Sequence, residues 1–185
     1  MEPLLDDDKL AALIDRHGEL ELEASEQPFE RLVTSIVNQQ LSTSSAEAIR
    51  TRLFEKFEIQ PEPLLEAGEE ELAATGLSRQ KIDYIRSAAE RFIEDDLSPE
   101  KFEHMTDQKV MDELTSIHGV GDWTAKMFLI FVLGREDIFP VEDLGIRKAM
   151  EELYGDMTRE EMVAKAEDWK PYRSIASLYL WRLVD

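Results

Sequence analysis

Apolar residues recur every three or four positions along most of the chain, with charged residues between them. This spacing is typical of helices that bury one face. It predicts a first helix from Leu4 to about Gly18, a second from Phe29 to Asn38 and a third that starts near Ser42. No stretch of alternating apolar and polar residues indicates a strand. The pattern therefore predicts an all-α fold.

Helix ends are marked further along the chain as well. A helix should end at Gly76, and Ser78 should cap the long helix that follows it. Thr158 and Glu161 have the spacing of a capping box. Further helices are expected in MTDQKVMDELTSI, TAKMFLIFVLG, LGIRKAMEELYG and PYRSIASLYLWRLV.

Composition narrows the class of protein. The chain has 185 residues, with 41 acidic and 21 basic side chains and a net charge of −20. It has no cysteine, which excludes disulfides, thiolate metal sites and iron–sulfur clusters held by cysteine. No signal peptide and no apolar run of membrane-spanning length is present. We expect a cytoplasmic protein with no membrane partner.

The negative charge argues against a nucleic-acid partner, but its distribution is uneven. Residues 28–57 and 115–150 together hold eight basic and eight acidic side chains, so the whole net charge lies elsewhere. Either buried segments simply carry less charge, or an acidic, hydrated surface spares a binding face. The second interpretation suits a salt-adapted organism, in which salt screens charges strongly.

One motif with chemical meaning is HGVGDW at 118–123, between two expected helices. Gly119 and Gly121 would permit a tight turn with positive φ. The free N–H groups at the start of the next helix could bind a phosphate without a basic side chain. The alternative is an ordinary turn between two helices.

Carboxylate and aromatic residues supply further candidates. Asp143 follows an extended segment and stands at the N-cap of a helix, where aspartate is also common for purely structural reasons. Trp123 and Trp181 lie near helix ends, where tryptophan is more often a core or rim residue. An indole that faces a cavity would instead favour a cationic, planar ligand. In IVNQQLS, the polar residues at a helix end are either a plain terminus or a probe that enters a groove.

Taken together, these motifs resemble the helix–hairpin–helix (HhH-GPD) DNA glycosylase superfamily, in particular the DNA-3-methyladenine glycosylase II branch. The resemblance extends from about Phe29 to Trp181. It rests on FERLVTSIVNQQLSTSSAEAI, TGLSRQKIDYIRSAA, LTSIHGVGDWTAKMF, FPVEDLGIRKAM and WKPYRSIASLYLW. Asp143 lies 20 residues after Trp123, which is about the distance from the hairpin to the catalytic carboxylate in that family.

The resemblance implies a role for each motif. Asp143 would be the catalytic carboxylate, with Glu142 its non-catalytic neighbour. The base pocket would contain Trp123, Trp181, Met127 and Leu144. Gln39, Gln40 and Leu41 match the loop that fills the gap left by a flipped nucleotide, without indicating which residue inserts. The hairpin residues His118, Gly119, Gly121 and Thr124 would hold DNA phosphate. The backbone carbonyls of Thr115, Ile117 and Val120 would bind a monovalent cation, Na⁺ or K⁺, and no other cofactor is expected.

Position 123 bears on the reaction. In relatives that also cut the strand, the matching residue is a lysine that attacks the sugar. Because Trp123 cannot form a Schiff base, the resemblance implies a monofunctional glycosylase without lyase activity. Its partner would be double-stranded DNA with damaged, cationic purines, which it would flip and excise.

The resemblance also implies an organisation of the fold. We expect a two-lobed helical bundle with the active site in the cleft between the lobes. One lobe would be residues 29–136 with the hairpin, and the other would join 1–28 to 137–185. We expect a monomer in a prokaryotic cell, associated with the nucleoid. The alternatives are a glycosylase for deaminated or mismatched bases, a helix–hairpin–helix module that only binds DNA, and an acidic protein-interaction module.

Overall fold

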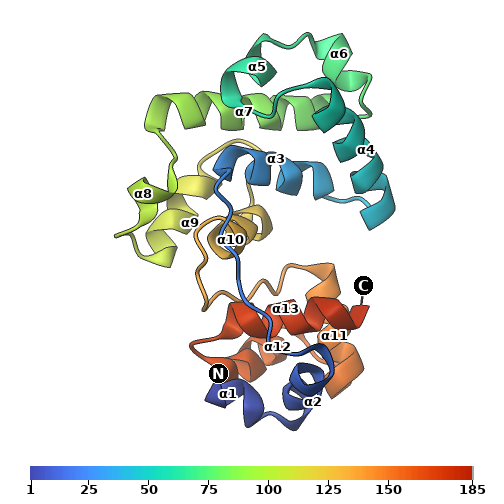
Figure 1. Cartoon of the computed structure of the whole chain (residues 1–185), viewed down its shortest axis with the longest axis vertical. Coiled ribbons are helices and arrows are strands. Elements are labelled where there is room, and N and C mark those ends of the chain that lie inside the picture. The colour runs from blue at the N-terminus through green and yellow to red at the C-terminus, as the bar shows by residue number, and fades with distance from the viewer. Residues whose placement is uncertain (185) are drawn as a thin grey trace. The chain divides into compact units, whose positions relative to one another are not determined.

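The computed structural model describes residues 1–184, and the regular elements in this range are all helices (Figure 1). The prediction of an all-α fold is confirmed. Within the described range, no helix combines the length and the apolarity that a membrane span requires. The chain forms two compact units. We call Ser25–Phe128 the hairpin unit, and Met1–Ala24 together with Leu129–Asp185 the Asp143 unit.

The hairpin unit contains seven whole helices and most of an eighth. They are α3 (Pro28–Asn38), α4 (Thr43–Lys56), α5 (Pro61–Glu66), α6 (Glu69–Ala73), α7 (Arg79–Asp95), α8 (Pro99–Phe102), α9 (Asp107–Thr115) and α10 (Asp122–Phe131), which continues past the unit's end. The expected starts are confirmed: the hydroxyls of Ser42 and Ser78 cap α4 and α7 by accepting bonds from the backbone N–H three residues on.

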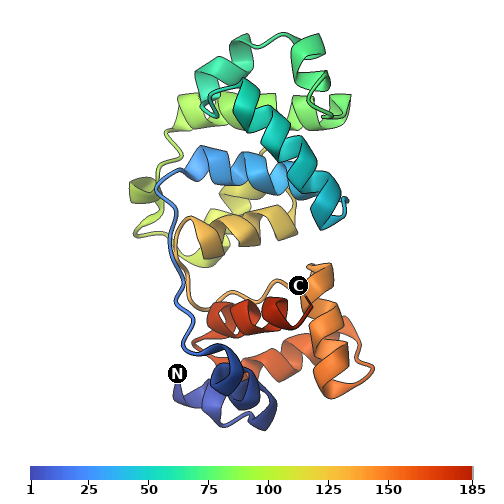
Figure 2. The same ribbon diagram turned by 45° about the vertical axis from the view of Figure 1, so that its right-hand side comes forward.

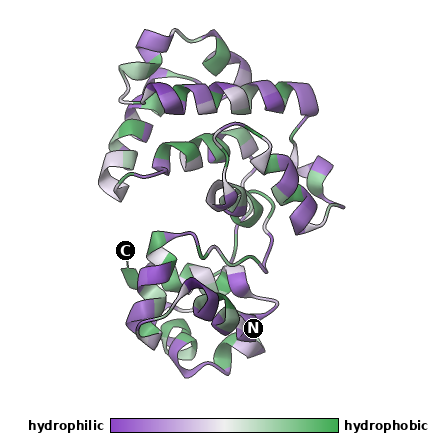
Figure 3. Cartoon of the chain, turned by 180° about the vertical axis from the view of Figure 1, so that it is seen from behind, coloured by the Kyte–Doolittle hydropathy of each residue, from purple (hydrophilic) through white to green (hydrophobic). Residues whose placement is uncertain are grey.

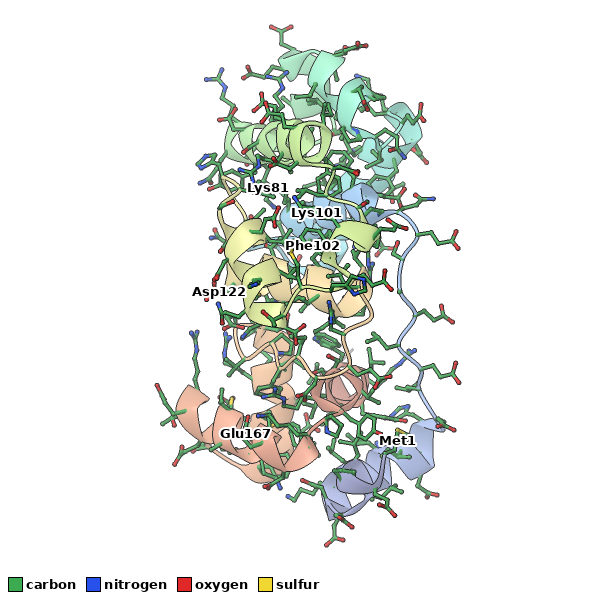
Figure 4. The ribbon with its side chains drawn as sticks, turned by 90° about the vertical axis from the view of Figure 1, so that its left-hand side faces the viewer. Met1, Lys81, Lys101, Phe102, Asp122 and Glu167 are labelled. Atoms are coloured by element: carbon green, nitrogen blue, oxygen red, sulfur yellow. The ribbon has the colours of Figure 1, made fainter. Side chains whose placement is uncertain are left out.

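The core of the hairpin unit is built around α3. Its apolar face is buried as the spacing predicts, with Leu32, Val33 and Ile36 at most 1% exposed. The long α7 lies along α3 (Figure 2). Figure 3 shows hydrophilic and hydrophobic residues alternating along the helices, since each buries only one face. Lys101 and Phe102 mark α8 in Figure 4, where Phe102 is fully buried and meets Phe128 edge to face.

The Asp143 unit contains both ends of the described chain. Its elements are α1 (Glu2–Leu5), α2 (Asp8–His17), α11 (Leu144–Tyr154), α12 (Arg159–Ala166), the 3₁₀ helix η1 (Glu167–Trp169) and α13 (Arg173–Val184). The capping box at Thr158 and Glu161 is confirmed. Buried residues of α2, α11, α12 and α13 form one core, which includes the fully buried side chains of Trp169 and Tyr179. The Tyr179 hydroxyl donates to the carbonyl oxygen of Gly18 at 3.0 Å, which joins α13 to the end of α2.

The first helix is not continuous, contrary to the prediction for Leu4 to Gly18. Asp7 interrupts it, because its carboxylate accepts from the backbone N–H of Lys9 and of Leu10 and so caps α2. The same carboxylate accepts from Tyr154 Oη at 2.9 Å and Trp169 Nε1 at 3.2 Å. The side chain of Lys165 lies 2.8 Å away. These contacts attach the N-terminal helices to α11, α12 and η1.

These contacts shift the pKa values of Asp7 and Tyr154. Burial raises the pKa of Asp7, but the hydrogen bonds from Lys165, Trp169 and Tyr154 outweigh it and lower the pKa from 3.8 to about 2. Burial and the neighbouring Asp7 carboxylate raise the pKa of Tyr154. Asp7 is therefore a negative centre on which the packing of the N-terminal segment depends.

The boundaries of the two units differ from those expected. Residues 29–136 and 1–28 with 137–185 were predicted, whereas the structure divides after Ala24 and after Phe128. The reason lies in the contacts of the residues just beyond position 128. Phe131 contacts the Trp181 ring at a centroid distance of 5.6 Å, and the carbonyl oxygen of Arg135 accepts from the Ser174 hydroxyl at 2.6 Å. The last turn of α10 therefore packs with the Asp143 unit.

Candidate functional site

The turn between α9 and α10 forms a tight hairpin. The N–H of Val120 donates to the carbonyl oxygen of Ile117 at 3.1 Å, and α10 begins two residues later at Asp122. Gly119 has a φ of +89°, and a Cβ there would lie 2.0 Å from Cγ of Tyr84. Glycine is thus required at position 119 for its backbone conformation and for its contact with α7. The prediction of a positive φ is wrong for Gly121: its φ is not positive, and a Cβ there would meet nothing within 4 Å.

The candidate phosphate-binding residues divide into two groups. His118 is exposed, and its ring packs edge to face on Tyr84 with centroids 4.9 Å apart. Gly119 and Gly121 lie beside it on the turn. The side chain of Thr124 is instead buried at 1% exposure, and its hydroxyl accepts a hydrogen bond inside the unit. Of these four residues, His118 and Gly121 are exposed, Gly119 is partly buried against Tyr84, and Thr124 is buried.

The α3–α4 turn carries the three candidate inserting residues, and the structure separates them. Gln39 is half-buried, and its amide nitrogen donates to the carbonyl oxygen of Gly119 at 3.0 Å and to the Thr124 hydroxyl at 2.9 Å. Gln40 is exposed with a φ of +55°, and Leu41 is 40% exposed. Gln39 therefore points toward the hairpin, while its two neighbours project from the turn.

An open groove of about 820 Å³ lies between this turn, the start of α7 and the hairpin. Its lining includes Gln39, Gln40 and Leu41, Lys81 and Tyr84 of α7, and residues 115–121. Thr115, Ile117 and Val120, the candidate cation ligands, all belong to this lining. Lys81, labelled in Figure 4, donates from Nζ to the carbonyl oxygens of Val37 at 2.6 Å and Gln39 at 2.9 Å. Burial lowers the pKa of Lys81.

The first helical residues after the hairpin include two of the candidate base-pocket residues. Trp123 is half-buried in the first turn of α10. Met127, one turn later, is only 6% exposed. Trp123 is thus the more accessible of the two.

Asp143 caps α11 in the other unit, as the sequence predicts. Its Oδ1 accepts from the backbone N–H of Ile146 at 3.0 Å and from Nε1 of Trp181 at 3.0 Å. A Cβ at position 145 would lie 3.0 Å from that oxygen and 3.3 Å from Cδ1 of Trp181, so Gly145 leaves room for the indole. Leu144 is 56% exposed beside the carboxylate. The orientation of the Asp143 carboxylate is therefore fixed by two donors.

The sequence did not reveal the residues that support Asp143. Trp181 was expected in the base pocket, and its hydrogen bond to Asp143 spans 38 positions that no local spacing rule connects. The segment before Asp143 is anchored on the start of α13. There, Ser174 Oγ accepts from the N–H of Ile138 at 2.9 Å, and Arg173 pairs with Asp137 at 2.7 Å. Serine and arginine at a helix start give no distinctive signal, because both are common on surfaces.

Helices α9 and α10 with their glycine turn define a helix–hairpin–helix protein, and the comparisons with known proteins agree. A family model described as "HhH-GPD superfamily base excision DNA repair protein" matches residues 33–172. The chain therefore belongs to the HhH-GPD superfamily of base excision DNA repair proteins.

One relative is DNA-3-methyladenine glycosylase 1 of Schizosaccharomyces pombe. It is 33% identical over 84% of this chain and 72% of its own length. Two other relatives are longer, one from Bacillus subtilis and the other the DNA-3-methyladenine glycosylase of Saccharomyces cerevisiae, and the chain spans 66% of the length of each.

Two solved structures resemble nearly the whole chain. The DNA-3-methyladenine glycosidase of Bacillus halodurans is 35% identical and has a TM-score of 0.82, covering 99% of this chain and 88% of its own. The S. pombe 3-methyladenine DNA glycosylase, solved in complex with abasic DNA, is 28% identical and has a TM-score of 0.88, covering 98% and 96%. The all-α fold is thus that of the HhH-GPD glycosylases.

Proposed function

We propose that the chain is a monofunctional DNA glycosylase that excises alkylated, cationic purines such as 3-methyladenine from double-stranded DNA in base excision repair. The observation that carries the proposal is the Asp143 carboxylate, which two donors orient at the start of α11 in a chain of this family. The names of the relatives support the same substrate class.

The proposed reaction is hydrolysis of the N-glycosidic bond. The damaged nucleotide is flipped out of the duplex. As the bond between sugar and base breaks, its electron pair leaves with the base and positive charge develops on the sugar. The Asp143 carboxylate stabilises that charge. Water then adds to the sugar and loses a proton, which leaves free base and abasic DNA.

The proposed base contacts are Trp123, Trp181, Met127 and Leu144. Alkylation at N3 or N7 gives a purine a positive charge, and stacking a cation on an indole contributes about 0.5–2 kcal/mol. We assign the principal stacking role to Trp123, because Met127 is nearly buried. The hydrogen bond from Trp181 to Asp143 gives Trp181 a second role in orienting the carboxylate.

The proposed DNA grip is the hairpin with the α3–α4 turn. The backbone around His118, Gly119 and Gly121 would hold phosphate. The carbonyl oxygens of Thr115 and Ile117, together with that of Val120, would hold Na⁺ or K⁺ and attract the same phosphate. Such oxygens suit a hard cation, and all three residues line one groove.

We also propose which residues enter the DNA. Gln40 and Leu41 project from the turn, and Leu41 is apolar and 40% exposed. An exposed leucine at the tip of a turn can replace a flipped base in the stack. We assign the insertion to Leu41, with Gln40 beside it.

Strand cleavage is not part of the proposed reaction. The residue that follows the hairpin is Trp123, and its indole has no amine that could attack the sugar. We therefore propose that the product is an intact strand with an abasic site.

The charge of −20 leads to a proposal about the setting. We propose that the protein is a monomer that acts on the nucleoid in the cytoplasm of a salt-adapted prokaryote. Backbone N–H groups at the hairpin would bind phosphate without depending on basic side chains, and DNA contacts of few basic residues release few counterions. Binding would then weaken little as salt rises.

The test is release of base from methylated duplex DNA by wild type and by Asp143→Asn, across KCl from low to molar concentration. Free 3-methyladenine and 7-methylguanine are measured by chromatography, and strand breaks are measured with and without alkali. Release by wild type alone, with breaks only after alkali, is the expected result. Release by both proteins would contradict the role of Asp143. Breaks without alkali would contradict the monofunctional reaction, and activity only on deaminated or mismatched duplexes would contradict the substrate class.

A further inference from the structure

Gln39 is placed differently from the two residues after it. Its amide nitrogen has two N–H groups, and both are engaged, one by the carbonyl oxygen of Gly119 at 3.0 Å and one by Thr124 Oγ1 at 2.9 Å. Gly119 lies on the hairpin turn, and Thr124 lies on the helix after it. We call this arrangement the Gln39 bridge. It joins the hairpin turn and the start of α10 to the end of α3.

The backbone of residue 39 is held as well. Lys81 of α7 donates from Nζ to the carbonyl oxygen of Gln39 at 2.9 Å and to that of Val37 at 2.6 Å. The hairpin in turn is pressed against α7, because Gly119 has no side chain and faces the Tyr84 ring. Position 39 is therefore the point where α3, α7 and the hairpin meet.

The amide cannot serve as an inserting group while it makes these bonds. A carbonyl oxygen only accepts hydrogen bonds, so the donor end of the amide must face Gly119. The acceptor at Thr124 is buried at 1% exposure, and a buried hydroxyl without its donor is unfavourable. Withdrawing Gln39 into DNA would break both bonds at once.

We infer that Gln39 is a positioning residue, which sets the geometry of the inserting turn relative to the phosphate-binding hairpin and thereby the affinity for duplex DNA. This inference rests on the proposed function, since it assumes that both segments contact one duplex. Two segments that already have a fixed mutual geometry lose less conformational entropy on binding. The Gln39 bridge therefore acts on binding and leaves the chemical step at Asp143 unchanged.

The test is Gln39→Leu, which keeps the size of the side chain and removes both donors. Dissociation constants are measured on a short undamaged duplex at one KCl concentration, together with single-turnover base release at saturating methylated DNA. We expect the dissociation constant to rise about tenfold, equivalent to about 1.4 kcal/mol, and the saturated rate to change less than twofold. We also expect faster hydrogen exchange at the Val120 amide, which lies in the turn.

Two further variants keep the test decisive. Thr124→Val replaces the buried hydroxyl by a methyl group and removes one of the two bonds, so we expect a smaller rise, about threefold. The Gln39→Leu/Thr124→Val double variant should bind as Gln39→Leu does, because that bond is already lost. The control is Gln108→Leu, which removes an exposed side-chain hydrogen bond to Asp112 on α9. It should change neither the dissociation constant nor the saturated rate.

The outcomes separate the inference from the proposed function. If wild type releases no base, the proposed function fails, while the duplex affinities still test the bridge. Unchanged affinity and unchanged Val120 exchange in Gln39→Leu would overturn the inference. A slower saturated rate with unchanged duplex affinity would show that Gln39 itself enters DNA and would also overturn it. The inference would also be overturned if Gln39→Leu lost binding only in proportion to its unfolded fraction.

Discussion

The role proposed for Asp143 can be separated from its structural role by two substitutions. Oδ1 of Asp143 caps α11 through the N–H of Ile146 and accepts from Trp181 Nε1, both at 3.0 Å. Asparagine retains an oxygen at that position and is itself a favoured N-cap. Asp143→Asn therefore preserves both bonds and removes the charge. Asp143→Ala removes the charge and both bonds.

The magnitudes can be worked from these contacts. Loss of the cap costs about 1 kcal/mol, and leaving the half-buried Trp181 N–H unpaired costs about 1 kcal/mol. We expect Asp143→Ala to lower the free energy of unfolding by about 2 kcal/mol, or the Tm by roughly 5 °C. Asp143→Asn should stay within about 0.5 kcal/mol of wild type. Both should lose about 10²–10³-fold in rate, on the order of the loss of one preorganised electrostatic group.

The assay combines thermal unfolding with single-turnover release of 7-methylguanine at saturating methylated duplex. The expected pattern is equal loss of rate in the two variants with unequal loss of stability. Equal destabilisation by both variants would refute the capping argument. A rate for Asp143→Asn within tenfold of wild type would refute the assignment of the carboxylate, whatever its stability.

Three more predictions concern other parts of the chain. Gly119→Ala should lower the free energy of unfolding by about 2–5 kcal/mol, because the backbone would be strained and the new methyl group would overpack against α7. Gly121→Ala should change the free energy of unfolding by less than about 1 kcal/mol, because a Cβ there meets nothing within 4 Å. Chemical denaturation of the two variants measures both values. Because the pKa of Asp7 lies at about 2, below its usual 3.8, its carboxylate stabilises the folded chain at neutral pH by about 1–2 kcal/mol after allowance for solvent screening. That contribution should disappear as pH falls from about 4 to 2, and urea titrations of Asp7→Asn should show lower stability at pH 7 and a flatter response to acid. Trp181→Phe keeps an aromatic ring but removes the donor to Asp143, so we expect about tenfold slower single-turnover release with unchanged affinity for undamaged duplex; a normal rate would contradict the orienting role.

Local sequence determined the helices and several of their ends. The spacing of Phe29, Leu32, Val33 and Ile36 predicted the buried face of α3. A helix completes a turn every 3.6 residues whatever it packs against, so residues at this spacing lie on one face. Ser78 and the Thr158–Glu161 pair act on N–H groups within three residues, so their capping was also readable from the chain. The N-cap position of Asp143 was predicted for the same reason.

Tertiary structure decided how the candidate residues are used. Gln39 and Gln40 are adjacent in sequence and identical in chemistry, yet only Gln39 reaches the hairpin, 80 positions away at Gly119. Asp143 accepts a hydrogen bond from Trp181, 38 positions away, and Asp7 accepts one from Tyr154, 147 positions away. Such pairs depend on which helix faces pack together, and a pattern within one helix carries no information about its partner. The sequence therefore determined the elements and the candidate groups by local geometry, and packing alone decided which of them meet.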